Sequence, residues 1–415
     1  MDIFALYRKY VPHRFRHRVR QAYYYIRCKI LHLEPSLCFS IDEYKQSYPL
    51  EIETISTFPI RLFSSLPRYA LTSPQKIDFT TEYAGHTYKI RNACCYAHSG
   101  VIRLNNGSFY YELRNRYQDL GKHISCQDGT VWMIDEPNYY HIKRFTKRGR
   151  LSRAVLFTDI FSGNYYHFTL SILPKLAYLN GVKRNVPLLV DNSVKRIAGY
   201  QQLIQLCNIQ NRALLFMEDD VAYYVDELYC VSSIMMACPQ YRLNQPMAID
   251  DDLYNEDTID WLRDRLLPNK ANISTPPRFF ISRKNASGLR KFNEDECIAM
   301  LKTYGFEVVY PEDSSVEEQI ALFNNAEFII GGSGAAFTNL LYANEHTNII
   351  ILEGYKSNIC IFSSIAAHLN LNLIYQYDKT LGSIPSGYDI HSDFVVNVSD
   401  LEKLIIQMLK GNEEQ

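Results

Sequence analysis

The segment from residue 327 to 342, EFIIGGSGAAFTNLLY, constrains the fold more than any other part of the chain. An apolar run at 328–330 passes through four small residues directly into a predicted helix. At such a helix start, backbone N–H groups face open space and suit an anion such as a diphosphate. A second apolar run, 348–352, ends on Glu353, whose carboxylate can accept hydrogen bonds from a ribose. Together the two runs predict a nucleotide-binding half-domain.

Strand and helix patterns alternate around this segment. Beyond residue 278 the alternation predicts a parallel sheet with helices on both faces. Its helices carry start signals, in which Asn293 precedes Glu296, Ser315 precedes Glu318 and Ser399 precedes Glu402. The strands are expected at 278–283, 308–310, 328–330, 349–352 and 373–375.

A second α/β series precedes this one. It predicts strands at 155–158, 186–190, 213–217 and 224–231, with helices at 165–179 and 199–206. Pro174 must bend or restart the first of these helices. Residues 40–150 instead alternate apolar and polar side chains over short runs, with a hairpin signal at Asn106–Gly107.

We therefore expect an α/β protein of GT-B architecture, with two Rossmann-like domains facing a cleft and a β-rich N-terminal region. In doubly wound sheets the ligand lies beyond the carboxyl ends of the strands, so Arg283, the glycine loop and Glu353 should meet at one edge. The expected divisions are a basic aromatic segment at 1–35, a β-rich module at 36–150, an acceptor domain at 151–245, a connection at 246–277, a donor-binding domain at 278–380 and a C-terminal tail and helix at 381–415.

The first 33 residues are basic and aromatic, with no acidic residue from 3 to 33. Such segments dock on anionic membrane surfaces, although a helix packed on the body with solvated arginines has the same composition. The segment could also be an RNA-binding arm, but the net charge of −1 argues against a general nucleic-acid binder, and we expect no nucleic-acid partner. The ten cysteines form no C-x-x-C pair, which indicates reduced thiols in the cytoplasm. The start lacks an apolar leader pattern, so we expect a cytoplasmic protein, peripheral at the inner membrane.

Four blocks of the chain resemble glycosyltransferase family 61. They are NYYHFTLSILPKL at 164–176, ISRKNASGLRKFNE at 281–294, EQIALFNNA at 318–326 and GGSGAAFTNLLYA at 331–343. Their order and spacing match over about 155–375, while the first 150 residues add little. The chain departs from the family at Ser333, where members commonly have a histidine in the glycine loop.

The resemblance implies a GT-B fold and inverting transfer from a nucleotide sugar, with UDP the expected nucleotide and no metal or other cofactor. Bacterial members accompany capsule and surface-polysaccharide genes. The basic start of this chain fits that type, with a glycan or a lipid-linked glycan as acceptor.

Inverting transfer needs a group that takes the acceptor proton, and positive charge at the leaving diphosphate. His167, in the block at 164–176, is the first candidate proton acceptor, because a neutral imidazole suits this task. It could instead cap or pack its helix, or contact the donor phosphate. Asp159 is the second, unless it simply terminates its strand.

The donor-binding candidates flank the glycine loop. Arg283 and Arg290 suit phosphate oxygens, although each could instead form a surface ion pair. The loop residues could equally serve close strand–helix packing, Asn339 could hold a loop, and Glu353 could cap a helix. The full set is Arg283, Arg290, Gly332, Ser333, Gly334, Ala335, Asn339 and Glu353.

Three other functions compete with this one. The acidic runs 218–220 and 250–252 could hold a divalent cation, as in GT-A enzymes, but neither lies on a strand of the donor series. The glycine loop also suggests a dinucleotide fingerprint, yet Phe337 stands where its third glycine belongs. The last is a catalytically degenerate scaffold that binds a sugar nucleotide or glycan.

Overall fold

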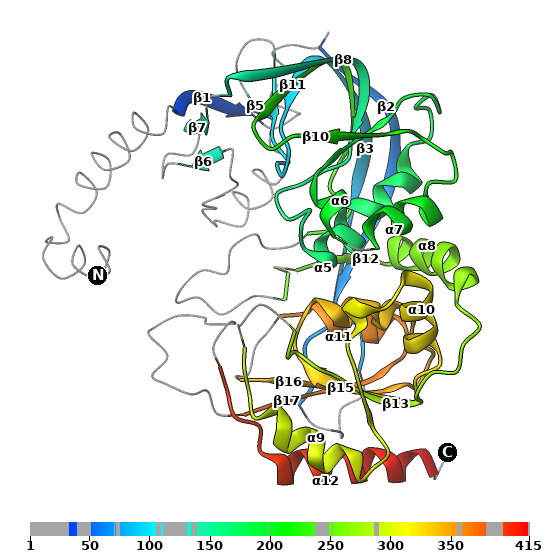
Figure 1. Cartoon of the computed structure of the whole chain (residues 1–415). Coiled ribbons are helices and arrows are strands. Elements are labelled where there is room, and N and C mark those ends of the chain that lie inside the picture. The colour runs from blue at the N-terminus through cyan, green and yellow to red at the C-terminus, as the bar shows by residue number, and fades with distance from the viewer. Residues whose placement is uncertain are drawn as a thin grey trace, which may run out of the picture.

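The structure is a computed structural model. It describes residues 33–39, 51–69, 71, 75–104, 109–110, 131–133, 139–143, 145–197, 199–236, 249–250, 252–285, 290–354, 359–378 and 393–413. The fold is mixed α/β, with a curled sheet of twelve strands and a second, parallel sheet of five strands. They occupy the upper and lower parts of Figure 1. No helix in the described ranges is long and apolar enough to span a membrane.

The first sheet joins a parallel part to a longer antiparallel part. β8, β9, β10 and β11 run parallel, and β11 then pairs antiparallel with β3. Strands on both sides of residue 150 thus share one sheet. The bounds are β1 Leu33–Phe39, β2 Ile52–Ser64, β3 Phe79–Cys95, β4 Ile102–Arg103, β5 Phe109–Tyr110, β6 Val131–Met133, β7 Tyr139–Lys143, β8 Lys147–Leu156, β9 Leu188–Asp191, β10 Leu214–Met217, β11 Val221–Val231 and β12 Tyr254–Asn255.

The helices of this part follow the parallel strands. The helix expected at 165–179 changes form twice, as α5 Tyr165–His167, π-helix η1 Phe168–Ile172 and 3₁₀ helix η2 Leu173–Tyr178. Pro174 lies at the start of η2, a position that tolerates proline because its missing backbone N–H is not needed there. The remaining helices are α6 Ser193–Arg196, α7 Tyr200–Cys207, α8 Glu256–Leu266 and η3 Leu267–Asn269.

The second sheet has the predicted parallel series, in the order β14-β13-β15-β16-β17. Alternate strand residues enter two separate cores, so helices cover both faces as expected. In Figure 1, α9 and α12 lie on one side of this sheet, and α10 and α11 on the other. The elements are β13 Arg278–Ile281, α9 Glu294–Lys302, β14 Glu307–Val309, η4 Pro311–Asp313, α10 Val316–Asn324, β15 Phe328–Gly332, η5 Ala335–Tyr342, β16 Asn348–Glu353, α11 Ile361–His368, β17 Asn372–Tyr377 and α12 Val398–Glu413.

One of the three predicted helix starts has the expected geometry. Ser315 and Glu318 form a complete capping box on α10. Asn293 makes no cap bond; its Oδ1 accepts from the N–H of Val396, 2.7 Å away, which ties α9 to the segment before α12. At α12, Asn397 rather than Ser399 accepts from a backbone N–H of the first turn, so that predicted capping box is wrong.

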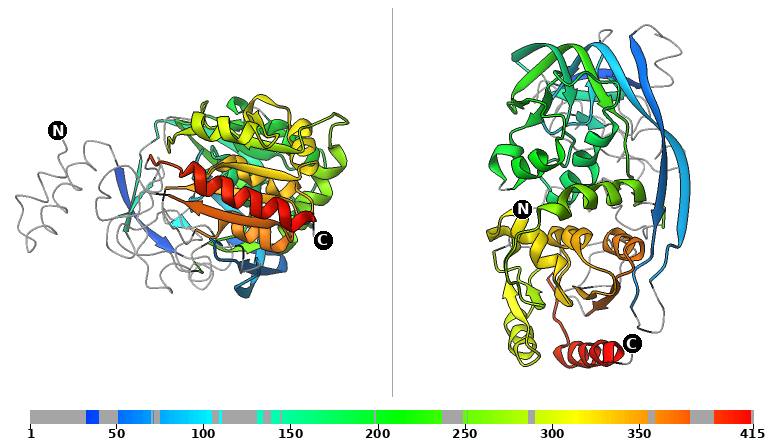
Figure 2. Two further views of the ribbon diagram at one scale, coloured as in Figure 1. Left: turned by 90° about the horizontal axis from the view of Figure 1, so that it is seen from below. Right: turned by 90° about the vertical axis from the view of Figure 1, so that its right-hand side faces the viewer.

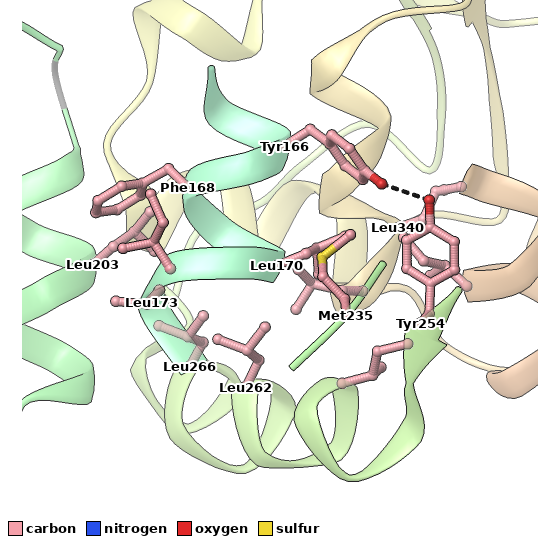
Figure 3. Packing of buried hydrophobic residues seen from close by; sticks show 14 of the residues in the cluster. Tyr166, Phe168, Leu170, Leu173, Leu203, Met235, Tyr254, Leu262, Leu266 and Leu340 are labelled. Atoms are coloured by element: carbon pink, nitrogen blue, oxygen red, sulfur yellow. Dashed lines mark hydrogen bonds between the residues drawn. The ribbon is translucent and has the colours of Figure 1, made fainter. Parts of the chain in front are cut away.

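The two sheets share a continuous apolar core. Figure 3 shows Leu173 beside Leu262 and Leu266 of α8 and Phe168 beside Leu203 of α7, with Leu340 of η5 on the opposite side of the cluster. The hydroxyls of Tyr166 and Tyr254 are hydrogen-bonded at this junction. The helix 165–178 is therefore held between the glycine-loop helix and α8.

The β2–β3 hairpin also links the two parts, and Figure 2 (right) shows it running alongside both. The N–H of Ser65 donates to Ser364 Oγ on α11 at 3.0 Å, and Ser363 Oγ donates back to the carbonyl of Ser65 at 2.6 Å. The N–H of Tyr375 on β17 donates to the carbonyl of Arg68 at 2.7 Å. Residues 1–32, which include most of the basic segment, and the turn at 106–107 lie outside the described residues.

Candidate active site

Arg283, Arg290 and Ser333 meet at the carboxyl edge of the second sheet. β13 pairs in parallel with β15, so the segments that follow these strands leave from the same edge. The Nη1 of Arg283 donates to the carbonyl of Ser333 at 3.1 Å, and the Nη1 of Arg290 donates to the same oxygen at 2.8 Å. The structure thus brings together three of the residues predicted to bind a donor.

Two like charges converge on one carbonyl oxygen here. Burial, and then the nearby charge of Arg290, lower the pKa of the Arg283 guanidinium below its usual range. Arg290 also has a backbone φ of 60°, in the left-handed region that residues with a side chain seldom adopt. An anion bound at this edge would offset the repulsion, which makes the pair suitable for a diphosphate.

The glycines of the loop make room for Arg283. A Cβ on Gly334 would lie 2.2 Å from Nη1 of Arg283, and a Cβ on Gly332 would lie 2.9 Å from its Cδ. A side chain at either position would therefore have to displace the side chain of Arg283. The glycines therefore serve close packing, and this packing also holds the positive charge of Arg283 against the loop.

The arginine loop is fixed in turn by Glu294, the first residue of α9. This buried carboxylate accepts from the hydroxyl of Ser282 and from the N–H of Arg283, the latter at 3.2 Å. The segment that follows β13 is thereby held against the helix. The second sequence block is thus a structural unit that positions its arginine.

Glu353 lies at the neighbouring strand end. β15 pairs with β16 through Gly332 and Leu352, and the N–H of Ser333 donates to the carbonyl of Leu352 at 3.0 Å. Glu353 is the last residue of β16 and is buried. Ala335 begins the 3₁₀ helix η5 directly after the loop, so loop, helix start and carboxylate share one edge as predicted.

Asn339 has a different setting. Its buried side chain accepts from the hydroxyl of Tyr165 at 2.6 Å and donates to Gln319 Oε1 at 2.8 Å. The amide therefore ties η5 to α5 and α10. This arrangement matches the loop-holding alternative, and it joins the two parts of the molecule beside the glycine loop.

His167 and Asp159 both belong to the segment that follows β8. The half-buried imidazole of His167 stacks on Phe161, with ring centroids 4.5 Å apart, and meets Tyr166 edge-on. Burial lowers its pKa to about 4, so the ring is neutral at neutral pH. Asp159 Oδ1 accepts from the N–H of Ile160 at 2.7 Å and shapes the turn after the strand.

A second polar cluster escaped the sequence reasoning. Buried Asp191 ends β9, accepts from the hydroxyl of Thr158 at 2.6 Å, and lies 3.5 Å from His98 Nδ1. Its signal, an acid directly after the apolar run 186–190, is the one that identified Glu353. The sequence gives no comparable signal for His98, because this residue lies in a turn that follows β3.

The two acidic runs differ in their surroundings. Asp219 Oδ1 lies 3.3 Å from His98 Nε2, whereas Asp220 pairs with Lys147 at 2.7 Å. Asp252 is buried next to β12. Within the described part of the chain, no three His, Cys, Asp or Glu side chains are grouped so that they could hold a metal ion.

The fold and this edge define an α/β protein with paired guanidinium groups on a glycine loop. Residues 165–350 match the model of the family described as Glycosyltransferase 61. This match supports a glycosyltransferase of family 61, and that family implies a nucleotide-sugar donor and a glycan acceptor. No curated protein matches the chain significantly.

Proposed function

We propose that the protein is an inverting glycosyltransferase of GT-B type that binds a UDP-sugar at the carboxyl edge of the second sheet. The single observation that supports this most is the convergence of Arg283 and Arg290 on the carbonyl of Ser333. It lies on the glycine loop, inside the range matched by the family model. The two sheets would then be the halves of the GT-B cleft.

Each donor contact follows from this placement. The guanidinium groups of Arg283 and Arg290 would bind the diphosphate, and the N–H groups of Gly334 and Ala335 at the start of η5 would complete its site. The carboxylate of Glu353 would accept from the ribose hydroxyls. The two arginines supply positive charge for the leaving group, so we propose a reaction without a metal ion. Ser333 would replace the common family histidine through its backbone and hydroxyl.

The transfer itself needs one proton acceptor. We propose that the acceptor hydroxyl gives its proton to His167 while its oxygen attacks the anomeric carbon from the side opposite the diphosphate. The bond to the diphosphate oxygen breaks, and the nucleoside diphosphate leaves with the electron pair. Asp159, on the same segment, is the alternative proton acceptor. The hydrogen bond of Tyr165 to Asn339 ties this segment to the glycine-loop helix.

We further propose a role in bacterial capsule or surface-polysaccharide synthesis at the cytoplasmic face of the inner membrane, with a glycan or lipid-linked glycan acceptor. The basic aromatic composition of residues 1–33 supports the membrane part. Deleting these residues should release the protein from vesicles containing phosphatidylglycerol in a sedimentation assay. Equal sedimentation of both forms would refute membrane docking through this segment.

The alternative is a scaffold that binds a sugar nucleotide without transfer, which the serine at position 333 favours. Purified full-length protein should be incubated with a panel of nucleotide sugars and p-nitrophenyl glycosides. Release of a nucleoside diphosphate together with a glycosylated product supports the transferase. Donor binding without transfer or hydrolysis would favour the scaffold, and NAD(H) binding without donor binding would overturn both.

A further inference from the structure

A series of polar side chains in contact with one another extends from the core to the surface at the carboxyl ends of β8, β9 and β10. Its inner end is Asp191, whose side chain is 1% exposed and accepts from the hydroxyls of Ser162 and Ser193 and from the N–H of Ser193 at 2.9 Å. Because several donors hydrogen-bond to this buried carboxylate, its position is fixed, and it can in turn fix the side chain that contacts it from the surface side.

His98 is the next member of this series. Its Nδ1 lies 3.2 Å from Ser162 Oγ and 3.5 Å from Asp191 Oδ2, and its side chain is 30% exposed. The backbone φ of His98 is 53°, a conformation that costs energy for a residue with a side chain. The fold therefore keeps the imidazole between the buried carboxylate and the surface at some cost in backbone energy.

Two exposed groups meet the other ring nitrogen. His98 Nε2 lies 3.3 Å from Asp219 Oδ1 and 3.4 Å from Arg196 Nη2. The side chains of Asp219 and Arg196 are 53% and 60% exposed, and their closest charged atoms are 3.9 Å apart. A carboxylate, a guanidinium and an imidazole, all planar, thus present donors and acceptors to solvent around one point.

We propose that His98, Arg196 and Asp219 form a subsite that binds hydroxyl groups of the acceptor glycan. This inference rests on the proposed function and assigns the acceptor side of the same reaction. Carboxylate and guanidinium groups can each engage two neighbouring hydroxyls, which is the recognition that a sugar ring offers.

The subsite lies beside the segment that reaches the donor edge. Ser162 contacts His98, Phe161 stacks on His167, and Tyr165 is bonded to Asn339 on η5. One segment of the chain therefore links the subsite, the proposed proton acceptor and the glycine-loop helix. The proposed subsite and the proposed proton acceptor therefore adjoin the same segment.

Neighbouring acids provide a matched test. Asp219 and Asp220 are 53% and 56% exposed, but only Asp219 faces His98, while Asp220 pairs with Lys147. The probe is the p-nitrophenyl glycoside that wild-type protein glycosylates fastest. Asp219→Asn and Arg196→Gln should each raise the KM for this glycoside about tenfold or more, with the donor KM unchanged. Asp220→Asn should match wild type in both. Unchanged glycoside KM in both subsite variants would overturn the proposal.

A binding measurement keeps the test independent of turnover. Imidazole resonances of ¹³C-labelled histidine in the full chain can be followed by NMR while the same glycosides are added, with His98→Gln used to assign His98. A saturable shift of the His98 resonance by at least one glycoside is the expected result, and no shift across the panel overturns the subsite. Failure of wild type to release nucleoside diphosphate from any donor would instead count against the proposed function.

Discussion

Replacing Arg283 by alanine should weaken donor binding without unfolding the protein. The guanidinium lies against the glycine loop and is half-buried, so the charged hydrogen bonds that we propose it makes to a diphosphate would be shielded from water. Losing such bonds costs about 1.5–3 kcal/mol. Since about 1.4 kcal/mol corresponds to tenfold in affinity, the Kd should rise roughly 10- to 150-fold. The loop keeps one cation, because Arg290 still donates to Ser333.

Isothermal titration of UDP into wild type and variant measures this directly. Arg278 is the matched control, because it begins the same strand β13 at its opposite end and pairs with Glu327 at 3.9 Å. Arg278→Ala should leave the Kd for UDP unchanged. Thermal unfolding of both variants checks that the sheet is intact. A Kd for Arg283→Ala within twofold of wild type, in a folded variant, would remove this residue from the donor site.

Three further predictions follow from the same contacts. Gly334→Ala should weaken UDP binding about tenfold, because the new Cβ displaces the Arg283 guanidinium; unchanged titration would show that the loop adapts. His167→Ala should lower kcat roughly 10²–10⁴-fold at unchanged UDP affinity. A base works unprotonated, and burial lowers the pKa of His167 to about 4, so the kcat of wild type should stay level from pH 8 to pH 5 and decrease as the pH drops below about 4. Wild-type turnover in the alanine variant would favour another base. Tyr165→Phe should lower the free energy of unfolding in urea by about 1–3 kcal/mol, since buried Asn339 loses its donor, and an unchanged midpoint would contradict that role.

The parallel sheet and its edge could be predicted because their signals are local. Apolar runs of three or four residues, each followed by small or charged residues, fix where β13, β15 and β16 end. Parallel pairing then brings those ends together without further information. Arg283, Ser333 and Glu353 were found in this way, and so was the capping box of Ser315.

The rest depends on contacts between distant parts of the chain. The β2–β3 hairpin reaches α11 through Ser65 and Ser364, a pairing that no local pattern encodes. Asn293 has the right spacing for a cap, but a tertiary bond to Val396 takes its side chain. His98 joins Asp191 only because β3 and β9 belong to one sheet. Asp191 itself has the same local signal as Glu353, an acid directly after an apolar run.

The location of the donor diphosphate tests the central claim most directly. A crystal structure of the full chain soaked with UDP should show the diphosphate against Gly334 and Ala335, with the guanidinium of Arg283 in contact and the ribose at Glu353. Diphosphate density at any other place in the molecule, with this edge empty, would contradict the account.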